Sequence, residues 1–253
     1  MAKLNDRVAL ITGAARGLGF AIAKRFVEDG AKVVLSDIDE NAGIEAAKSL
    51  GANAHFVTCD VGDAKAVDAL INATLAKFST LDILVNNAGI VSPADFLDVT
   101  ESDFDRVLRV NVKGSFLAGQ AAAKQMVAQI KAGKKPGAII NMSSVGGLVG
   151  SPLGIAAYHA SKHGVLGLTK AAALEYAPQK IRVNAVCPGA STSEMTDTWF
   201  AGSSLREAFI ERHPLGRLGE PGDSARATLF LASDASSFIT GAALPVDGGY
   251  SVG

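Results

Sequence analysis

The sequence predicts a single α/β domain in which helices cover both faces of a parallel sheet. Short, almost continuously apolar segments alternate with longer segments of helical periodicity along the whole chain. Strands that are apolar throughout are buried on both faces, and their alternation with helices is typical of parallel βαβ units. No linker, repeat or low-complexity tract divides residues 1–253, so we expect one doubly wound sheet of about seven strands.

Four apolar runs in the first half of the chain are interpreted as strands, and the segments between them as helices. In the first of these helices Leu18, Ile22 and Phe26 fall on one face, which is the spacing of an amphipathic helix. The expected strands are 8–11, 32–36, 54–58 and 81–85, and the expected helices are 17–29, 40–50 and 63–78.

Longer helices follow in the second half, and their ends are marked by capping residues and prolines. Thr100 and Asp103 resemble a capping pair, Pro178 stops one helix, and Pro221 begins another. The stretch 190–214 is less regular, and we expect it to form a substrate-binding lid within the domain. The expected helices are 102–132, 155–176 and 221–232, and the expected strands are 137–142, 181–186 and 243–246.

Composition and charge exclude several classes of function. The chain is 48% hydrophobic and 19% charged, so it can bury a large core and is not expected to be disordered. Its net charge is −1 without a basic block, which argues against a nucleic-acid partner. No apolar run reaches the roughly 18 residues of a membrane span, and the N-terminal residues do not resemble a signal peptide. We therefore expect a cytoplasmic protein without a membrane partner.

The cysteines and histidines predict no metal site. Cys59 and Cys187 lack metal-type spacing and are expected to be buried, reduced thiols. None of the histidines shows a ligand motif. His159 and His163 lie one helical turn apart, but without a third ligand they are interpreted as helix-surface residues.

A glycine-rich loop links the first predicted strand to the first predicted helix. Gly13, Gly17 and Gly19 permit a tight turn and close approach to a pyrophosphate, and the helix that follows presents its N-terminal amides to the phosphates. In this strand–loop–helix context the pattern predicts a Rossmann-type dinucleotide site. We assign the three glycines, with Arg16 and Leu18, to cofactor binding.

An acidic residue ends the second predicted strand and favours NAD over NADP. Asp37 lies 18 residues after Gly19, where a carboxylate accepts hydrogen bonds from an adenosine ribose and repels a 2′-phosphate. Arg16 points the other way, because an arginine in the loop can pair with that phosphate. We weigh Asp37 above Arg16 and predict NAD as the cofactor.

Tyr158 and Lys162 form a candidate acid/base pair. On a helix this spacing places the two side chains on the same face, about 5–6 Å apart at Cβ. A free tyrosine titrates near pH 10, and a neighbouring ammonium favours the phenolate. We therefore expect Lys162 to lower the pKa of Tyr158, so that its phenol can exchange a proton near neutral pH.

Together these residues resemble the short-chain dehydrogenase/reductase family, and the resemblance covers essentially the whole chain. The resemblance rests on motifs in a fixed order: 12–19, Asp60-Val61, 86–89, Asn111, Ser143-Ser144, Tyr158 with Lys162, Pro188-Gly189 and 241–249.

The resemblance implies four catalytic residues. Tyr158 is the proton donor or acceptor, and Lys162 lowers its pKa and holds the nicotinamide ribose. Ser144 hydrogen-bonds the reacting oxygen. Asn111 positions a water that connects Lys162 to solvent.

The resemblance also implies further contacts with the cofactor. Asp60 and Val61 flank the adenine. Asn87 and Gly89 border the cofactor, while Asn86 is interpreted as structural. The wall behind the nicotinamide is formed by Pro188 and Gly189.

Two positions depart from the family pattern. Ser144 lies 14 residues before Tyr158, one more than is usual, which leaves Ser143 as the alternative; we favour Ser144. After Gly189 the family often has an aliphatic residue and then a threonine, and here Ser191 and Ser193 occupy those positions. Ser193 keeps a hydroxyl for the carboxamide and Ser191 offers its backbone, with Thr192 as an alternative donor.

The predicted function is hydride transfer between NAD(H) and a neutral, fairly hydrophobic secondary alcohol or ketone. The segments 91–96, 145–155 and 190–214 are expected to shape the substrate pocket. The alternatives are an NADP-dependent 3-oxoacyl-type ketoreductase, which shares the catalytic residues, and a cofactor-binding regulatory protein without turnover. The resemblance further implies a homotetramer. The apolar residues expected around the substrate are Leu148, Val149, Leu153, Met195, Trp199 and Phe200.

Overall fold

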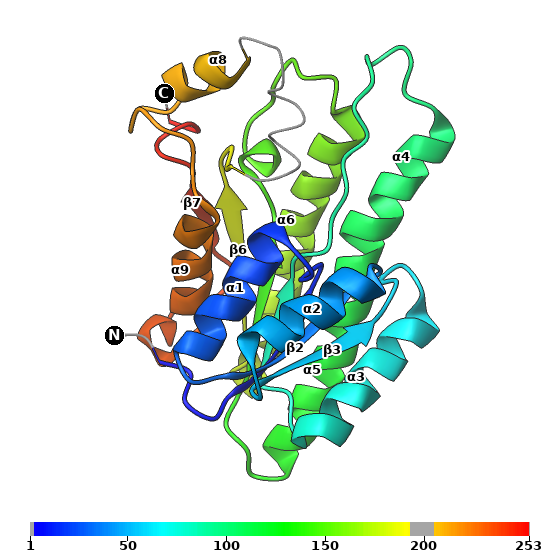
Figure 1. Cartoon of the computed structure of the whole chain (residues 1–253), viewed down its shortest axis with the longest axis vertical. Coiled ribbons are helices and arrows are strands. Elements are labelled where there is room, and N and C mark those ends of the chain that lie inside the picture. Colours follow the sequence, from blue (N-terminus) through cyan, green and yellow to red (C-terminus); the bar gives the residue numbers. More distant parts are fainter. Residues whose placement is uncertain (1–2, 193–204, 253) are drawn as a thin grey trace.

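A seven-stranded parallel sheet forms the centre of the protein. The computed structural model describes residues 3–192 and 205–252. The strands are β1 (Val8–Thr12), β2 (Lys32–Asp37), β3 (Ala54–Thr58), β4 (Ile83–Asn86), β5 (Ala138–Met142), β6 (Arg182–Pro188) and β7 (Ala243–Val246). Their order is β3-β2-β1-β4-β5-β6-β7, and every neighbouring pair is parallel (Figure 1). The predicted doubly wound sheet is confirmed.

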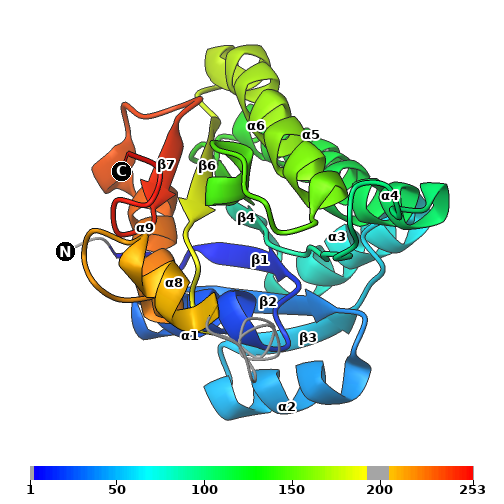
Figure 2. The same cartoon turned by 90° about the horizontal axis from the view of Figure 1, so that it is seen from above.

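Helices pack on both faces of this sheet. They are α1 (Gly17–Glu28), α2 (Glu40–Leu50), α3 (Ala64–Phe78), α4 (Glu101–Leu108), α5 (Ser115–Lys131), α6 (Ala156–Tyr176), α8 (Leu205–Glu211) and α9 (Pro221–Ala232), with short helical turns η1 (Arg109–Gly114), η2 (Val145–Gly147), η3 (Ala177–Gln179) and η4 (Asp234–Ser236). Seen from above, α1 and α9 lie on one side of the sheet, and α5 and α6 lie on the other (Figure 2).

Two apolar layers hold the sheet between the helices. On one face Ile22 and Phe26 of α1 are fully buried against the strands. On the opposite face Leu70 of α3 and Ala122 of α5 are fully buried in a second cluster. Every residue of β1 is buried, as expected for a strand covered on both faces. Leu18, predicted on the same face of α1 as Ile22 and Phe26 and also assigned to cofactor binding, lines a cavity at the carboxyl ends of the strands.

The single helix expected over 102–132 is confirmed in its extent, because the chain is helical without a break from Glu101 to Lys131, but its middle is not α-helical. The chain forms α4 and α5 separated by η1, a π-helical segment. Inside it the Ser115 hydroxyl donates to the carbonyl of Asn111 at 2.7 Å, a side-chain bond of the kind that bends helices. The helical periodicity on either side is regular, so the sequence gives no sign of the extra residue per turn. At the start of α4, Thr100 accepts a hydrogen bond from the Asp103 amide, as predicted.

Smaller differences concern the carboxyl side of the chain. β6 extends to Pro188, two residues beyond its expected end, and the irregular stretch 190–214 contains α8. Residues Ser193, Met195, Trp199 and Phe200 lie outside the described residues, as does much of the expected lid.

Both cysteines are free and buried, as predicted. Across the described ranges, no helix has the length and apolar character needed to cross a membrane.

Candidate active site

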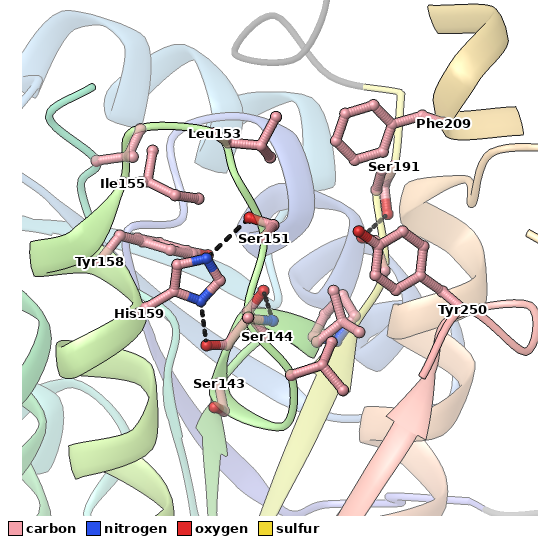
Figure 3. Close-up of a pocket in the computed structure, with 18 of the residues that line it drawn as sticks. Ser143, Ser144, Ser151, Leu153, Ile155, Tyr158, His159, Ser191, Phe209 and Tyr250 are labelled. Carbon is pink, nitrogen blue, oxygen red and sulfur yellow. Dashed lines mark hydrogen bonds between the residues drawn. The ribbon is translucent and has the colours of Figure 1, made fainter. Parts of the chain in front are cut away.

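The candidate site lies at the carboxyl ends of the strands, where parallel α/β sheets bind their ligands. This edge of the sheet is at the top of Figure 1, beneath α8. A cavity of about 170 Å³ opens there. Its walls come from α1, from the segment between β5 and α6, from α6 itself, and from the chain around Gly189, α8 and Tyr250 (Figure 3).

The glycine loop has the geometry of a phosphate cradle. Gly13 and Gly17 have φ values of +62° and +57°, a region that favours glycine. A Cβ on Gly19 would lie 2.2 Å from the Gly13 carbonyl oxygen, so only glycine fits there. The first turn of α1 has no acidic residue and no side-chain cap, and its amides are the groups that bind a diphosphate at a helix N-terminus. The loop therefore fits a dinucleotide.

Asp37 is fixed at the end of β2 beside this loop. Its carboxylate accepts hydrogen bonds from the Ala15 amide at 3.1 Å and the Asp39 amide at 3.2 Å. Each oxygen retains a lone pair that a ribose hydroxyl can use. The guanidinium of Arg16 pairs with Asp39. Asp39, which was not predicted from the sequence, adds a second negative charge at this position and forms an ion pair with the one arginine of the loop.

Asp60 and Val61 are also held by protein contacts. The Asp60 carboxylate accepts hydrogen bonds from the Gly62 amide at 2.9 Å and from Arg109 at 2.5 Å. The Arg109 guanidinium holds the pKa of Asp60 below its usual value. Val61 is buried and packs closely on Gly114 of η1. Their contact with an adenine stays a prediction.

The two asparagines after β4 support the sheet and the loop. Asn86 donates to the carboxamide oxygen of Asn141 at 2.9 Å, which is the structural role predicted for it. Asn87 donates to the carbonyls of Thr12 and Gly13 at 3.0 and 2.8 Å. It therefore braces the phosphate loop from the neighbouring strand.

Lys162 lies behind Tyr158 on α6 and is almost completely buried. Its Nζ is 5.4 Å from the centre of the Tyr158 ring and donates to the Met142 carbonyl at 2.7 Å. A Cβ placed on Gly89 would lie 3.5 Å from the same Nζ, so the ammonium group lies beside this glycine. Lys162 is 5% exposed, and burial lowers its pKa from 10.5 to about 8.

The pKa of Tyr158 moves in the direction opposite to the one predicted. Burial raises it, and the hydrogen bond with the Ser144 hydroxyl offsets this only in part. The expected lowering by Lys162 is therefore wrong for the protein alone. The physical reason is that the Lys162 ammonium lies over the ring and donates to the Met142 carbonyl. The cost of removing the phenolate from water is therefore the largest effect on the pKa of Tyr158.

The two serines after β5 have different partners. Ser143 is buried and donates to the carbonyl of Lys162 at 2.9 Å. Ser144 accepts from the Gly146 amide at 3.0 Å and hydrogen-bonds the Tyr158 phenol. This contact supports the choice of Ser144 over Ser143. The catalytic role of Ser144 stays a prediction.

Asn111 is held in η1 by hydrogen bonds on every side-chain polar atom. Its amide donates to the Ile90 carbonyl and to the Ser161 hydroxyl, both at 2.9 Å. Its carboxamide oxygen accepts from the Ile90 amide at 2.8 Å. Its backbone carbonyl accepts from the Ser115 hydroxyl at 2.7 Å. The water-positioning role implied by the family resemblance stays a prediction.

The end of β6 forms the wall opposite Tyr158. Gly189 donates to the Val246 carbonyl at 3.0 Å, and a Cβ on it would lie 2.9 Å from both Asp247 Cα and His213 Nε2. Ser191 is buried beside it and lines the cavity. This close packing explains why a glycine is needed at position 189.

Several cavity residues were missed by the sequence analysis. His159 is partly buried and lines the cavity, so its placement on the helix surface is wrong; its position next to Tyr158 was the available signal. Phe209 and Tyr250 stack with ring centres 6.3 Å apart and form an aromatic wall (Figure 3). Val149 and Leu153 line the cavity as predicted, whereas Leu148 packs in a separate core cluster.

Known proteins resemble this chain over nearly its full length. The family model described as enoyl-(acyl carrier protein) reductase matches residues 13–251. An uncharacterized oxidoreductase of Mycobacterium bovis is 46% identical over 97% of both chains.

Solved structures extend the similarity to the fold. A short-chain type dehydrogenase/reductase from Mycobacterium marinum has a TM-score of 0.93 at 36% identity, covering 99% of this chain and 98% of that one. A 3-ketoacyl-(acyl-carrier-protein) reductase from Brucella melitensis, solved with NADH, has a TM-score of 0.92 at 41% identity, covering 99% and 100%. The chain therefore belongs to the short-chain dehydrogenase/reductase family, whose members are oxidoreductases that use a nicotinamide cofactor.

Proposed function

We propose that the protein interconverts a neutral secondary alcohol and its ketone with NAD(H). The observation that carries this proposal is the meeting of the Tyr158 phenol and the Ser144 hydroxyl at one wall of the cavity, with the buried Lys162 behind them. A phenol and a hydroxyl at one point can hold a single substrate oxygen and exchange its proton.

In the alcohol-to-ketone direction, Tyr158 acts in its phenolate form, which takes the proton of the substrate hydroxyl and becomes the phenol. Ser144, whose oxygen accepts from the Gly146 amide, keeps its hydroxyl hydrogen available and donates it to the same substrate oxygen. The apolar walls keep water from the reacting carbon, and they hold the substrate in one orientation. The nicotinamide supplies the hydride chemistry when bound.

The preference for NAD rests on charge at the ribose. Asp37 and Asp39 both lie at the end of β2 or directly after it, and Arg16 is paired with Asp39. A 2′-phosphate there meets two carboxylates and one arginine already in an ion pair. The local charge balance therefore favours a ribose with free hydroxyls.

Asp37→Ala should relax this preference. Removing one carboxylate lowers the repulsion of the 2′-phosphate and removes an acceptor for the ribose hydroxyls. We expect the ratio of kcat/KM with NADP to that with NAD to rise at least about tenfold, which corresponds to about 1.4 kcal/mol. Steady-state kinetics with both cofactors measure the ratio, and the exposed Asp68→Ala on α3 serves as the control that leaves it unchanged.

A substrate panel tests the proposal directly. Secondary alcohols are offered with NAD, and the matching ketones with NADH, while the absorbance of NADH is followed. We expect turnover of neutral substrates in both directions. Absence of turnover across the panel, with tight NADH binding, would instead support a cofactor-binding regulatory protein.

The alternative is an NADP-dependent 3-oxoacyl-type ketoreductase. It is favoured by the likeness to the Brucella melitensis 3-ketoacyl-(acyl-carrier-protein) reductase. That structure contains NADH, so the likeness does not decide between the two cofactors. A 3-oxoacyl thioester assayed with NADH and with NADPH separates the two proposals, because the alternative requires higher kcat/KM for the thioester with NADPH.

Assembly, lid and location are further proposals. Phe104 of α4 and Phe116 of α5 are exposed, which supports an interface of a homotetramer on these helices. Sedimentation velocity measures the oligomeric state.

Phe209 of α8 lines the cavity, which supports a substrate-binding lid over 190–214. Residence in the cytoplasm stays a prediction.

A further inference from the structure

A chain of hydrogen bonds joins Ser144 to a second polar group in the cavity. Ser144 Oγ accepts from the Gly146 amide at 3.0 Å. The carbonyl of the same glycine lies 2.7 Å from His159 Nδ1, and His159 Nε2 lies 2.9 Å from Ser151 Oγ. Figure 3 shows Ser151 and His159 beside Tyr158, facing the aromatic wall.

When the imidazole of His159 is neutral, the partners fix the direction of each of these bonds. A carbonyl oxygen only accepts, so His159 Nδ1 carries the proton that it donates to Gly146. In the neutral imidazole the other nitrogen is then an acceptor, and Ser151 must donate to it. The Ser151 hydroxyl thereby uses its single hydrogen within the protein and presents only lone pairs to the cavity.

Gly146 also orients the Ser144 hydroxyl. Its amide donates to Ser144 Oγ, which leaves the Ser144 hydrogen for the reacting oxygen. A Cβ on Gly146 would stand 3.1 Å from His159 Nδ1 and 3.5 Å from Ser144 Oγ, so both side chains rest against this glycine.

Among the described residues, the cavity that contains Ser151 has mainly apolar walls. Val149, Leu153 and Ile155 line the same part of the cavity, so a substrate donor placed there has few other partners. We propose that Ser151, positioned by His159, forms a subsite for a second hydroxyl group on the substrate. The substrate class is then a hydroxy ketone or diol, more polar than the fairly hydrophobic ketone expected from the sequence. This inference rests on the proposed function, because it concerns the substrate of the same reaction.

Reduction of matched ketones with NADH tests the subsite in the wild-type enzyme. The probes are butanone, 3-hydroxybutanone, 4-hydroxy-2-butanone and the methyl ethers of the two hydroxy ketones. We expect at least one hydroxy ketone to exceed butanone in kcat/KM by about fivefold to tenfold, the value of one hydrogen bond. Its methyl ether should fall back to the level of butanone or below, since an ether has no hydrogen to donate.

Two variants separate recognition from structural support. Ser151→Ala should bring the ratio of hydroxy ketone to butanone close to one. His159→Phe frees the Ser151 hydrogen, so the enzyme should now accept the methyl ether and discriminate less between ether and hydroxyl. Ser49→Ala, a serine of α2 that bonds its own helix, is the control for both ratios.

The outcomes for subsite and function are distinct. Equal kcat/KM for butanone and both hydroxy ketones, unaltered by Ser151→Ala, would overturn the subsite while the proposed function stands. Absence of turnover with every ketone and with both cofactors would overturn the proposed function, and the subsite with it.

Discussion

Tyr158→Phe should abolish turnover while leaving NADH binding nearly intact. The substitution removes the only atom of Tyr158 that can exchange a proton and keeps the ring that lines the cavity. General acid–base catalysis is typically worth about 10²–10⁴-fold, so kcat should fall by at least about 100-fold. Turnover is measured by NADH absorbance, and binding by NADH fluorescence titration.

The matched control for this prediction is Tyr176→Phe at the end of α6. Tyr176 does not line the cavity, and its loss should leave kcat unchanged. Near-normal turnover by Tyr158→Phe, with the substrate that the wild-type enzyme uses, would show that another group transfers the proton.

Lys162→Met should lower both turnover and cofactor affinity. Methionine matches the length of the lysine stem but carries no charge, so the acid/base tyrosine loses its cationic neighbour and the ribose loses a donor. We expect kcat to fall by about 100-fold or more and the Kd for NADH to rise. Lys170→Met, at an exposed position on the same helix, should change neither; an active Lys162→Met enzyme would contradict the role of this lysine.

The same variant should change how stability depends on pH. Burial lowers the pKa of Lys162 from 10.5 to about 8 in the folded protein, whereas the unfolded chain keeps the ordinary value. Between these two pH values the unfolded chain binds more protons, so the free energy of unfolding rises with pH across that window and is flat below it. The contribution is about 3 kcal/mol.

Denaturant unfolding at several pH values between 7 and 10.5 measures this effect. The wild type should gain stability relative to Lys162→Met as the pH rises through the window, while Lys170→Met follows the wild type. A constant difference between wild type and Lys162→Met would mean that Lys162 titrates normally in the folded protein.

Much of the fold follows from local sequence. The apolar runs predict each strand because a strand between two helical layers must be apolar on both sides, and β3 and β7 have the expected bounds. The glycine loop is predictable for a different local reason, because the φ values at Gly13 and Gly17 and the close contact at Gly19 leave no room for a side chain. Asp37 was predictable from its distance along the chain to this loop.

The tertiary structure decided features that depend on residues far apart in sequence. The sequence did not predict η1, because the apolar spacing on either side of Asn111 is that of an ordinary α-helix. The pKa of Tyr158 rises because the fold buries its phenol. The spacing of Tyr158 and Lys162 along the helix does not predict this burial.

The chemistry of the cavity follows the same division. The sequence by itself determined the phosphate loop, the acidic residue at β2 and the spacing of Tyr158 and Lys162, since each is set by backbone geometry within a few residues. Only the folded chain joined Ser151 through His159 and Gly146 to Ser144, and Arg16 to Asp39. Hydrogen bonds and ion pairs of this kind depend on distances that the packing of distant segments sets, and packing is not encoded in any short stretch of sequence.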